Sequence, residues 1–238
     1  MTKYLVSVII PTTDKELHLA KACEASILAS TDENVQVHIV NLGKERSEQR
    51  NIGLDMATGQ YVMYLDSDQF ISSRLIGECV SLMHAGFMAV YIPEKIVTKG
   101  FFGYLRNWER AFYTSTPIDC VRFMRREICP KFDLELKGPE DSDHDRRVFG
   151  LRTTSKNWLY HDDNITLKDY LKKKAYYSKS MKEFQRRWPN DRVLNFWWRC
   201  FGVFFEQGKW RRVVRRPDLF LCVMALIFAR GVVYLWNK

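Results

Sequence analysis

The sequence predicts an α/β protein with a mostly parallel sheet flanked by helices, followed by a helical, basic and apolar C-terminal region. Between residues 4 and 92, short runs rich in β-branched and aromatic residues alternate with longer segments of helical composition, and this alternation is typical of parallel sheets. After residue 165, apolar residues recur at helical spacing, which indicates amphipathic helices. We therefore predict an α/β domain over residues 1–165 and a helical region over residues 166–238.

The elements of the first half are delimited by composition and by breakers. Residues 4–10 form a short apolar run that Pro11 closes, which favours a buried parallel strand over a helix. By the same reasoning we predict strands at 4–10, 35–40, 61–65 and 87–92, and helices at 15–29, 45–57 and from a cap at Ser72 or Ser73 to about residue 84.

The pattern after residue 92 is less regular, because aromatic and charged residues mix with several glycines and prolines. We predict a loop with a helix near 105–114 and a strand near 120–125, a helix at 140–149, an extended segment at 151–160 ended by His161, and a helix from Thr166 that Pro189 stops.

The excess positive charge lies in the C-terminal third. Residues 1–160 contain 20 Lys and Arg against 21 Asp and Glu, whereas residues 161–238 contain 17 against 7. Such a segment can bind nucleic-acid phosphates or an anionic membrane surface, and charge alone does not choose between them. The six cysteines are scattered without metal-finger spacing, and no signal peptide precedes the first apolar run. Both observations favour a reducing, cytoplasmic compartment.

Two carboxylates follow the third predicted strand directly. Asp66 and Asp68 stand at its C-terminal end with Ser67 between them, and open α/β sheets bind their ligands at that edge. Carboxylates at this spacing can hold Mg²⁺ or Mn²⁺, whose remaining positions take diphosphate oxygens. Further Asp-x-Asp triplets occur at 141–143 and 143–145, so the triplet by itself also fits a turn with an aspartate cap.

Several motifs accompany this loop in a fixed order. They are VSVIIPT at 6–12, QRNIGL at 49–54, ATGQY at 57–61, LDSD at 65–68, FD at 132–133, GPED at 138–141, Arg146 and His161. Together they resemble the family-2 glycosyltransferases of GT-A fold over about residues 4–180. The resemblance implies a GT-A-like sheet and a nucleotide-diphosphate sugar as donor.

The resemblance also implies roles for individual residues. It places the nucleotide beside five residues, namely Pro11, Thr12, Thr13, Asn41 and Arg50. It assigns the diphosphate to Asp66 and Ser67, and a divalent metal, Mn²⁺ or Mg²⁺, to Asp66, Asp68 and His161. It makes Asp141 the general base and Glu140 a residue of the acceptor site.

One position departs from the family pattern. The family usually has an Asp at the end of the second strand, often followed by Asp-Gly-Ser, whereas Asn41-Leu42-Gly43-Lys44 stands here. An asparagine can still hydrogen-bond a base or ribose, but its neutrality leaves uridine and guanosine both open as the donor nucleotide.

The residue types fit metal-dependent transfer of a hexose with inversion. An acceptor hydroxyl must lose its proton as it attacks the anomeric carbon, which one carboxylate within hydrogen-bond reach achieves. Charge builds on the leaving diphosphate, and a divalent cation neutralises it. A glycosidase would use two carboxylates roughly 5–10 Å apart, but it needs no metal loop at a strand end.

The C-terminal composition suits a membrane interface. Phe196, Trp197 and Trp198 precede a basic run at 209–216, and residues 219–236 are apolar apart from Arg230 and Gly231. Arg230 makes a single membrane span costly, so we expect peripheral or monotopic association with the cytoplasmic membrane face and a glycan or lipid-linked acceptor. A core helix or homo-oligomer interface, and a true span, are the alternatives.

Other interpretations remain open at this point. The chain could be a catalytically inactive sugar-nucleotide-binding module, or a nucleic-acid-binding protein, although the apolar tail suits lipid better than a phosphate backbone. At single positions, Asp141 could be a carboxylate favoured by a helix N-terminus, His161 a hydrogen-bonding residue at a strand end, and Arg50 a surface residue of a helix.

Overall fold

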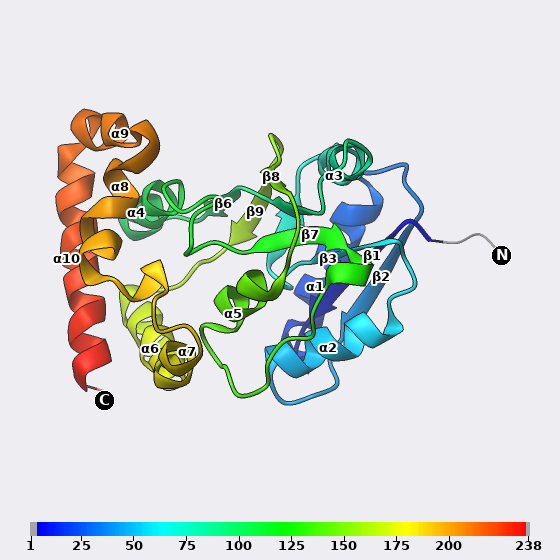
Figure 1. Ribbon diagram of the computed structural model, residues 1–238, viewed down its shortest axis with the longest axis horizontal. Helices are drawn as coiled ribbons and strands as arrows, with labels where there is room; N and C mark the ends of the chain where they lie inside the picture. The colour runs from blue at the N-terminus through cyan, green and yellow to red at the C-terminus, as the bar shows by residue number, and fades with distance from the viewer. Residues whose placement is uncertain (1–3, 237–238) are drawn as a thin grey trace.

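The computed structural model describes residues 4–236 and contains two sheets with helices around them (Figure 1). The larger sheet has the strand order β2-β1-β3-β7-β5-β8, with bounds Val35–Val40, Val6–Pro11, Tyr61–Tyr64, Val121–Arg125, Ala89–Tyr91 and Arg152–Thr154. β1 pairs parallel with β2 and β3, and β5 pairs parallel with β8, whereas β7 is antiparallel to both of its neighbours. The mostly parallel sheet flanked by helices confirms the predicted fold class.

β1 is buried along its whole length because helices cover both faces of the sheet. Val6 and Val8 belong to the apolar cluster that includes α1 (Leu17–Leu28) and α3 (Leu75–His84), whereas Ile9 belongs to the cluster on the side of α2 (Arg46–Met56). This alternation is the period-two pattern of a strand. α2 packs so closely that a Cβ at Gly53 would lie 2.4 Å from Ile9 Cγ2, so a glycine is required there.

A second, smaller sheet begins with the strand that follows the Asp66–Asp68 loop. Its order is β4-β9-β6, with bounds Gln69–Ile71, Leu159–Asp162 and Glu94–Val97. β9 is antiparallel to β4 and parallel to β6, and Gln69 lies opposite His161. The segment predicted as one strand at 151–160 therefore divides between the two sheets. β4 and β6 were not predicted, since strands of three and four residues are too short to show a period.

Several predicted helices differ from the structure, and the one expected near residues 105–114 lies at Gly100–Arg110. α3 begins after Arg74, which has a left-handed φ of 73°, and neither Ser72 nor Ser73 caps it. Ser72 Oγ instead accepts a hydrogen bond from the Trp158 amide (3.3 Å). The helix expected to run from residue 166 to Pro189 is broken into α6 (Leu167–Ser178) and α7 (Met181–Arg187).

The remaining elements lie beyond the sheets or connect them. They are α4 (Gly100–Arg110), α5 (Glu140–Arg147), α8 (Val203–Phe205), α9 (Trp210–Arg215), α10 (Pro217–Trp236), the π-helix η4 (Trp198–Gly202), and the short 3₁₀ helices η1 (Asp14–Glu16), η2 (Arg126–Ile128), η3 (Arg192–Leu194) and η5 (Glu206–Gly208).

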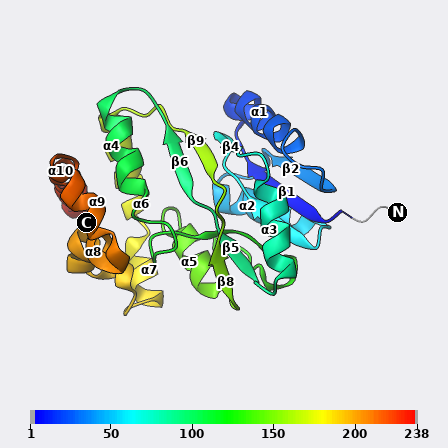
Figure 2. The same cartoon turned by 90° about the horizontal axis from the view of Figure 1, so that it is seen from above.

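The C-terminal helices gather with α4 at the end of the molecule farthest from β1 and β2 (Figures 1 and 2). Their apolar core joins residues from both sides of the predicted domain boundary at residue 165. Leu105, Phe112 and Leu136 pack in one cluster with Phe204 and Leu219. The division into residues 1–165 and 166–238 stays a prediction, but α4 and the C-terminal helices share one hydrophobic core.

α10 is long and apolar enough to cross a membrane by length and composition. One side of it is buried in the shared core, where Leu219 and Val223 have no exposed surface. On the other side, Leu221 and Phe228 are 68% and 75% exposed. Arg230 makes an ion pair with the buried Glu109 of α4.

Candidate active site

The C-terminal edge of the larger sheet brings together the residues predicted to hold the nucleotide. Pro11 ends β1, and the Thr12 amide donates to the Val40 carbonyl at the end of β2 (2.9 Å). Thr12 is buried, whereas Thr13 and Asn41 are exposed. The Asn41 amide nitrogen donates to Asp14 Oδ1 (3.0 Å). Adjacent parallel strands end at one edge, which is why these residues lie together.

Arg50 connects Asp66, a predicted metal ligand, with Asp141, the predicted general base. Its side chain is 1% exposed, with Nη2 2.9 Å from Asp66 Oδ1 and Nη1 2.5 Å from Asp141 Oδ1. The guanidinium carbon also lies 4.9 Å from the centre of the Phe132 ring. α2 therefore joins the end of β3 to the start of α5, and Arg50 is a buried ion-pair partner rather than a surface residue.

Arg46 is a second cation at this site, and it was not predicted from the sequence. One turn before Arg50 on α2, it lies 3.6 Å from Asp66 Oδ1 and 3.3 Å from Glu140 Oε1. It also donates to the Tyr177 hydroxyl of α6 (2.9 Å). The spacing of four residues between two arginines places them on one helix face, and this spacing was the available signal.

Asp66 and Asp68 have different surroundings within one loop. Burial raises the pKa of Asp66, but Arg46 and Arg50 outweigh it and hold that pKa well below its ordinary value. Asp68 Oδ2 lies 3.1 Å from His161 Nε2, while Asp68 Oδ1 is buried and has no hydrogen-bond partner among the described residues. Ser67 between them is buried.

His161 in β9 is held by carboxylates on both ring nitrogens. Nδ1 lies 2.9 Å from Glu94 Oε1, and Nε2 contacts Asp68. Burial lowers the pKa of His161, but its bonds to Asp68 and Glu94 raise it to about 10. Both ring nitrogens of His161 thus contact carboxylates in this structure, and its role as a metal ligand stays a prediction. Over residues 4–236, no three His, Cys, Asp or Glu side chains are placed to hold a metal ion.

Glu94, on the unpredicted strand β6, completes this part of the site. It contacts Arg110 (3.2 Å) and Arg122 (3.5 Å) in addition to His161. Burial raises its pKa, but Arg110 and His161 hold it far below its ordinary range. No feature of the sequence marked Glu94, since the strand that carries it is only four residues long.

Glu140 and Asp141 begin α5 and differ in charge state. Burial raises the pKa of Asp141, but Arg50 and Arg46 outweigh it and lower that pKa below its ordinary value. Burial and the adjacent charge of Asp141 raise the pKa of Glu140 to about 7. Asp141 is therefore ionised at neutral pH, and Glu140 exchanges its proton near neutrality.

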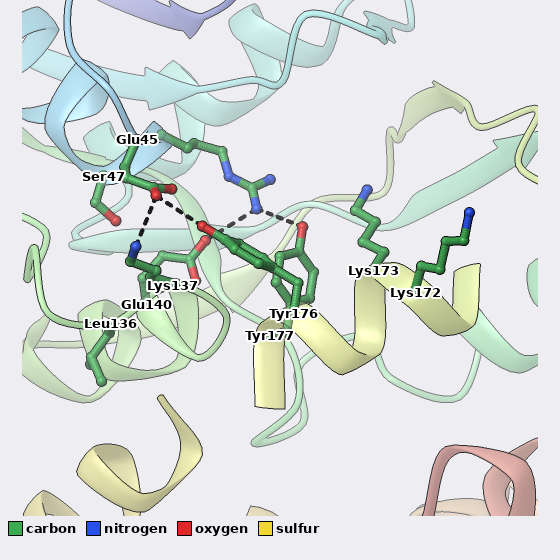
Figure 3. A pocket seen from close by; sticks show the side chains of 10 residues that line it. Glu45, Ser47, Leu136, Lys137, Glu140, Lys172, Lys173, Tyr176 and Tyr177 are labelled. Atoms are coloured by element: carbon green, nitrogen blue, oxygen red, sulfur yellow. Dashed lines mark hydrogen bonds and ion pairs between the residues drawn. The ribbon is translucent and has the colours of Figure 1, made fainter. Parts of the chain in front are cut away.

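A cavity of about 420 Å³ opens beside Glu140 (Figure 3). Its walls come from the start of α2, the segment before α5 and the second half of α6; its lining includes Arg46, Lys137, Glu140, Lys172, Lys173 and Tyr176. No residue that was predicted to bind the nucleotide lines this cavity, although Arg46 and Ser47 of α2 do. The cavity therefore adjoins the predicted acceptor residue rather than the Asp66 loop.

The sequence of this region matches a known family. Residues 43–133 match the family model described as glycosyl transferase family 2. This segment of the chain is therefore similar to that family. The match covers less than half of the 238 residues of the chain, and includes Arg46, Arg50, Asp66 and Asp68. A search of curated protein sequences finds no match.

The fold of this chain is similar to solved structures of S. aureus TarS. One of them has a TM-score of 0.51 and 17% identity, and the alignment covers 98% of this chain and 54% of that one. A structure of S. aureus TarS 1-349 in complex with UDP-GlcNAc has a TM-score of 0.51 and 16% identity, with 81% and 75% covered. The chain spans about half the length of the first. The likeness confirms the GT-A-like fold.

Proposed function

We propose that the protein is an inverting, metal-dependent glycosyltransferase that moves a sugar from a nucleotide-diphosphate sugar to a hydroxyl of a glycan or lipid-linked acceptor. The observation that carries the proposal is the position of Arg50 between Asp66 and Asp141. A carboxylate at a strand end and a carboxylate at a helix start, 75 residues apart, thereby lie on two sides of one guanidinium. Donor and acceptor chemistry can meet there.

Asp141 is the proposed general base. Its carboxylate is ionised at neutral pH and its side chain is 32% exposed, so an acceptor hydroxyl can reach it and give up a proton. Arg50 fixes one of its oxygens and leaves the other for the acceptor. Glu140, whose pKa of about 7 is matched to neutral conditions, is the alternative base.

The donor side needs positive charge for the diphosphate. Arg46 lies near the Asp66 loop and is part-exposed, so it can turn to the donor phosphates. Asp68 Oδ1, a buried anionic oxygen with no donor among the described residues, fits a divalent cation that prefers oxygen ligands. Asp68 and Asp66 would hold Mn²⁺ or Mg²⁺, which when bound stabilises the charge of the leaving diphosphate. Uridine diphosphate is the first nucleotide to test, since the similar TarS structure is a complex with UDP-GlcNAc.

We further propose that the C-terminal helices rest on the anionic cytoplasmic membrane face without crossing it. Large apolar side chains are exposed on α8, α9, α10 and the segment around η4; the most exposed are Trp197, just before η4, and Phe228, at 69% and 75%. Arg211, Arg212 and Arg215 are exposed beside them. This mixture of tryptophan, phenylalanine and arginine complements an anionic lipid surface. Since α10 buries its other side and pairs Arg230 with Glu109, it is held against the protein.

The test separates binding from turnover. Thermal shift and calorimetry with UDP and GDP, each with and without Mn²⁺, identify the nucleotide, and release of the nucleotide from the matching sugar donor, with water as acceptor, measures turnover. Asp141→Asn should keep donor affinity within about two-fold and reduce turnover by at least ~10²-fold, the usual scale for losing a general base. Asp55→Asn, at an exposed surface ion pair, serves as the control for loss of charge.

Two results would redirect the proposal. Turnover of Asp141→Asn within a few-fold of wild type, together with a large loss in Glu140→Gln, would make Glu140 the base. Tight donor binding with no turnover in the wild-type protein under any metal condition would favour the inactive sugar-nucleotide-binding module.

A further inference from the structure

The cavity beside Glu140 is lined by more basic side chains than the ion pairs around it neutralise. Lys137 lies 3.1 Å from Glu45, and the Tyr176 hydroxyl donates to the same carboxylate (2.8 Å). Lys172 is 67% exposed and has only a distant contact to Asp169 (3.7 Å). No ion pair is found for Lys173 among the described residues. In Figure 3 both lysines extend from α6, apart from the dashed contacts that join Glu45 to Lys137 and Tyr176.

The wall of the cavity also contains an unsatisfied oxygen. Glu140 is 2% exposed and its Oε1 contacts Arg46, but its Oε2 has no hydrogen-bond partner among the described residues. A buried carboxyl oxygen without a partner is costly. Because the pKa of Glu140 is about 7, this carboxyl group can accept from or donate to a hydroxyl near neutral pH. A ligand hydroxyl would satisfy it.

We propose that this cavity binds the acceptor as a phosphorylated alcohol, with a hydroxyl on Glu140 and a phosphate at Lys172 and Lys173. The inference rests on the proposed function and names its acceptor class. Adjacent lysines present ammonium groups that bind phosphate as point charges. The tyrosine rings of α6 supply a partly apolar wall for the carbon skeleton between the two groups.

The same phosphate chemistry could come from the donor diphosphate, and the geometry favours the acceptor. Arg46 stands between the cavity and the donor loop, since Nη2 contacts Glu140 and Nη1 faces Asp66. Pro11, Thr12 and Asn41 do not line the cavity. A nucleotide at the sheet edge and a phosphorylated alcohol in the cavity would therefore occupy opposite sides of Arg46.

Calorimetry with sn-glycerol 3-phosphate, inorganic phosphate and UDP tests this inference. The variant Lys172→Gln/Lys173→Gln should weaken glycerol 3-phosphate binding by at least ~10-fold, because two charged contacts are lost, while UDP affinity stays within about two-fold. The control variant Lys168→Gln/Lys182→Gln removes equal charge from exposed lysines outside the cavity and should leave both affinities unchanged. Glu140→Gln should weaken binding of glycerol 3-phosphate more than that of inorganic phosphate.

The outcomes are distinguishable from those of the proposed function. An equal loss in both lysine variants would overturn the inference, because it would show a general charge effect. A large loss of UDP affinity in the cavity variant would assign the lysines to the donor diphosphate and also overturn it. Absence of glycerol 3-phosphate binding to the wild-type protein would do the same, while donor binding and the effect of Asp141→Asn would still stand.

Discussion

At the scale of single residues, Arg50 organises the site. It is almost fully buried, and burial of a charge is costly unless the charge is paired. Asp66 and Asp141 supply that pairing, one from each side. Because the buried guanidinium must stay paired, it holds two distant parts of the chain together. The same contacts fix the two carboxylates that the proposed mechanism needs.

Asp66 and Asp68 should respond differently to substitution. Asp66→Ala removes a partner from two arginines, so we expect it to lower the free energy of unfolding by about 1–3 kcal/mol, the cost of an unsatisfied buried group. In Asp68→Ala, His161 keeps its contact with Glu94, so the melting temperature should change little. Both variants should lose Mn²⁺-dependent donor affinity. Denaturant titration and calorimetry measure the two effects, and unchanged Mn²⁺-dependent affinity in both variants would end the metal proposal.

His144 of α5 should make the stability of the protein depend on acid pH. Burial lowers its pKa from 6.5 to about 3, and its ring stacks on Phe132 at 4.1 Å. Since the unfolded state takes up a proton that the folded state refuses, this contribution is complete above pH 6.5 and is lost as the pH falls toward 3. The slope approaches about 1.4 kcal/mol per pH unit.

The measurement is a series of urea denaturation curves between pH 3 and 7 for wild type and His144→Leu. The leucine variant should have a flatter pH dependence in this window, whatever its stability at pH 7. Parallel curves for the two proteins would show that His144 is not the group responsible.

At the scale of elements, α10 has two unlike sides. Its inward side carries Leu219 and Val223 into the shared core, and Arg230 pairs with Glu109, which also accepts from the Tyr113 hydroxyl. The ion pair neutralises the charge that would otherwise make Arg230 costly in an apolar environment. It also ties the helix to α4, so the outward side of α10 is the part that would face the proposed membrane surface.

The Glu109–Arg230 pair should behave as a buried ion pair. Arg230→Met leaves Glu109 buried without its main partner and should cost about 3–5 kcal/mol of unfolding free energy. The double variant Glu109→Leu/Arg230→Met should recover most of that loss, because an apolar pair of similar volume replaces the charges. Urea denaturation of the four proteins in this cycle gives the coupling. Additive effects of the two substitutions would show that the pair contributes nothing in solution.

At the scale of the whole molecule, the C-terminal helices contribute both to the hydrophobic core and to the exposed apolar surface. Deletion of residues 190–238 would expose Leu105, Phe112 and Phe184 by removing the residues that cover them. We expect the truncated chain to be poorly soluble or to melt at a much lower temperature than the full chain. A truncated protein that keeps full donor affinity and its melting temperature would instead support a separate domain.

Membrane association should therefore be tested in the full chain. Trp197→Gln/Phe228→Gln removes two exposed side chains without touching the core and should reduce flotation with anionic vesicles while sparing donor binding. Phe149→Gln/Leu151→Gln, which removes two apolar side chains of similar exposure elsewhere, is the matched control. Equal flotation of all three proteins would exclude the surface around Trp197 and Phe228 as the binding surface.

The sequence by itself determined the features that are local. Alternating strands and helices predicted the sheet and placed Asp66 and Asp68 at the end of β3, since strand periodicity and strand ends are read from neighbouring residues. The motif order predicted the family. Only the tertiary structure decided which charges meet. Arg46 with Tyr177, Glu94 with His161 and Arg230 with Glu109 are separated by 131, 67 and 121 residues, and no local pattern carries such a pairing.

The predicted metal set shows the same limit. The sequence supplied Asp66, Asp68 and His161 as residue types that bind metals, but only the folded chain shows that the His161 ring lies between Asp68 and Glu94. Likewise, composition marked residues 166–238 as helical, basic and apolar, whereas packing decided that one side of α10 completes a core begun by α4. Residue type is encoded locally, but charge state and burial depend on neighbours that only the fold brings into contact.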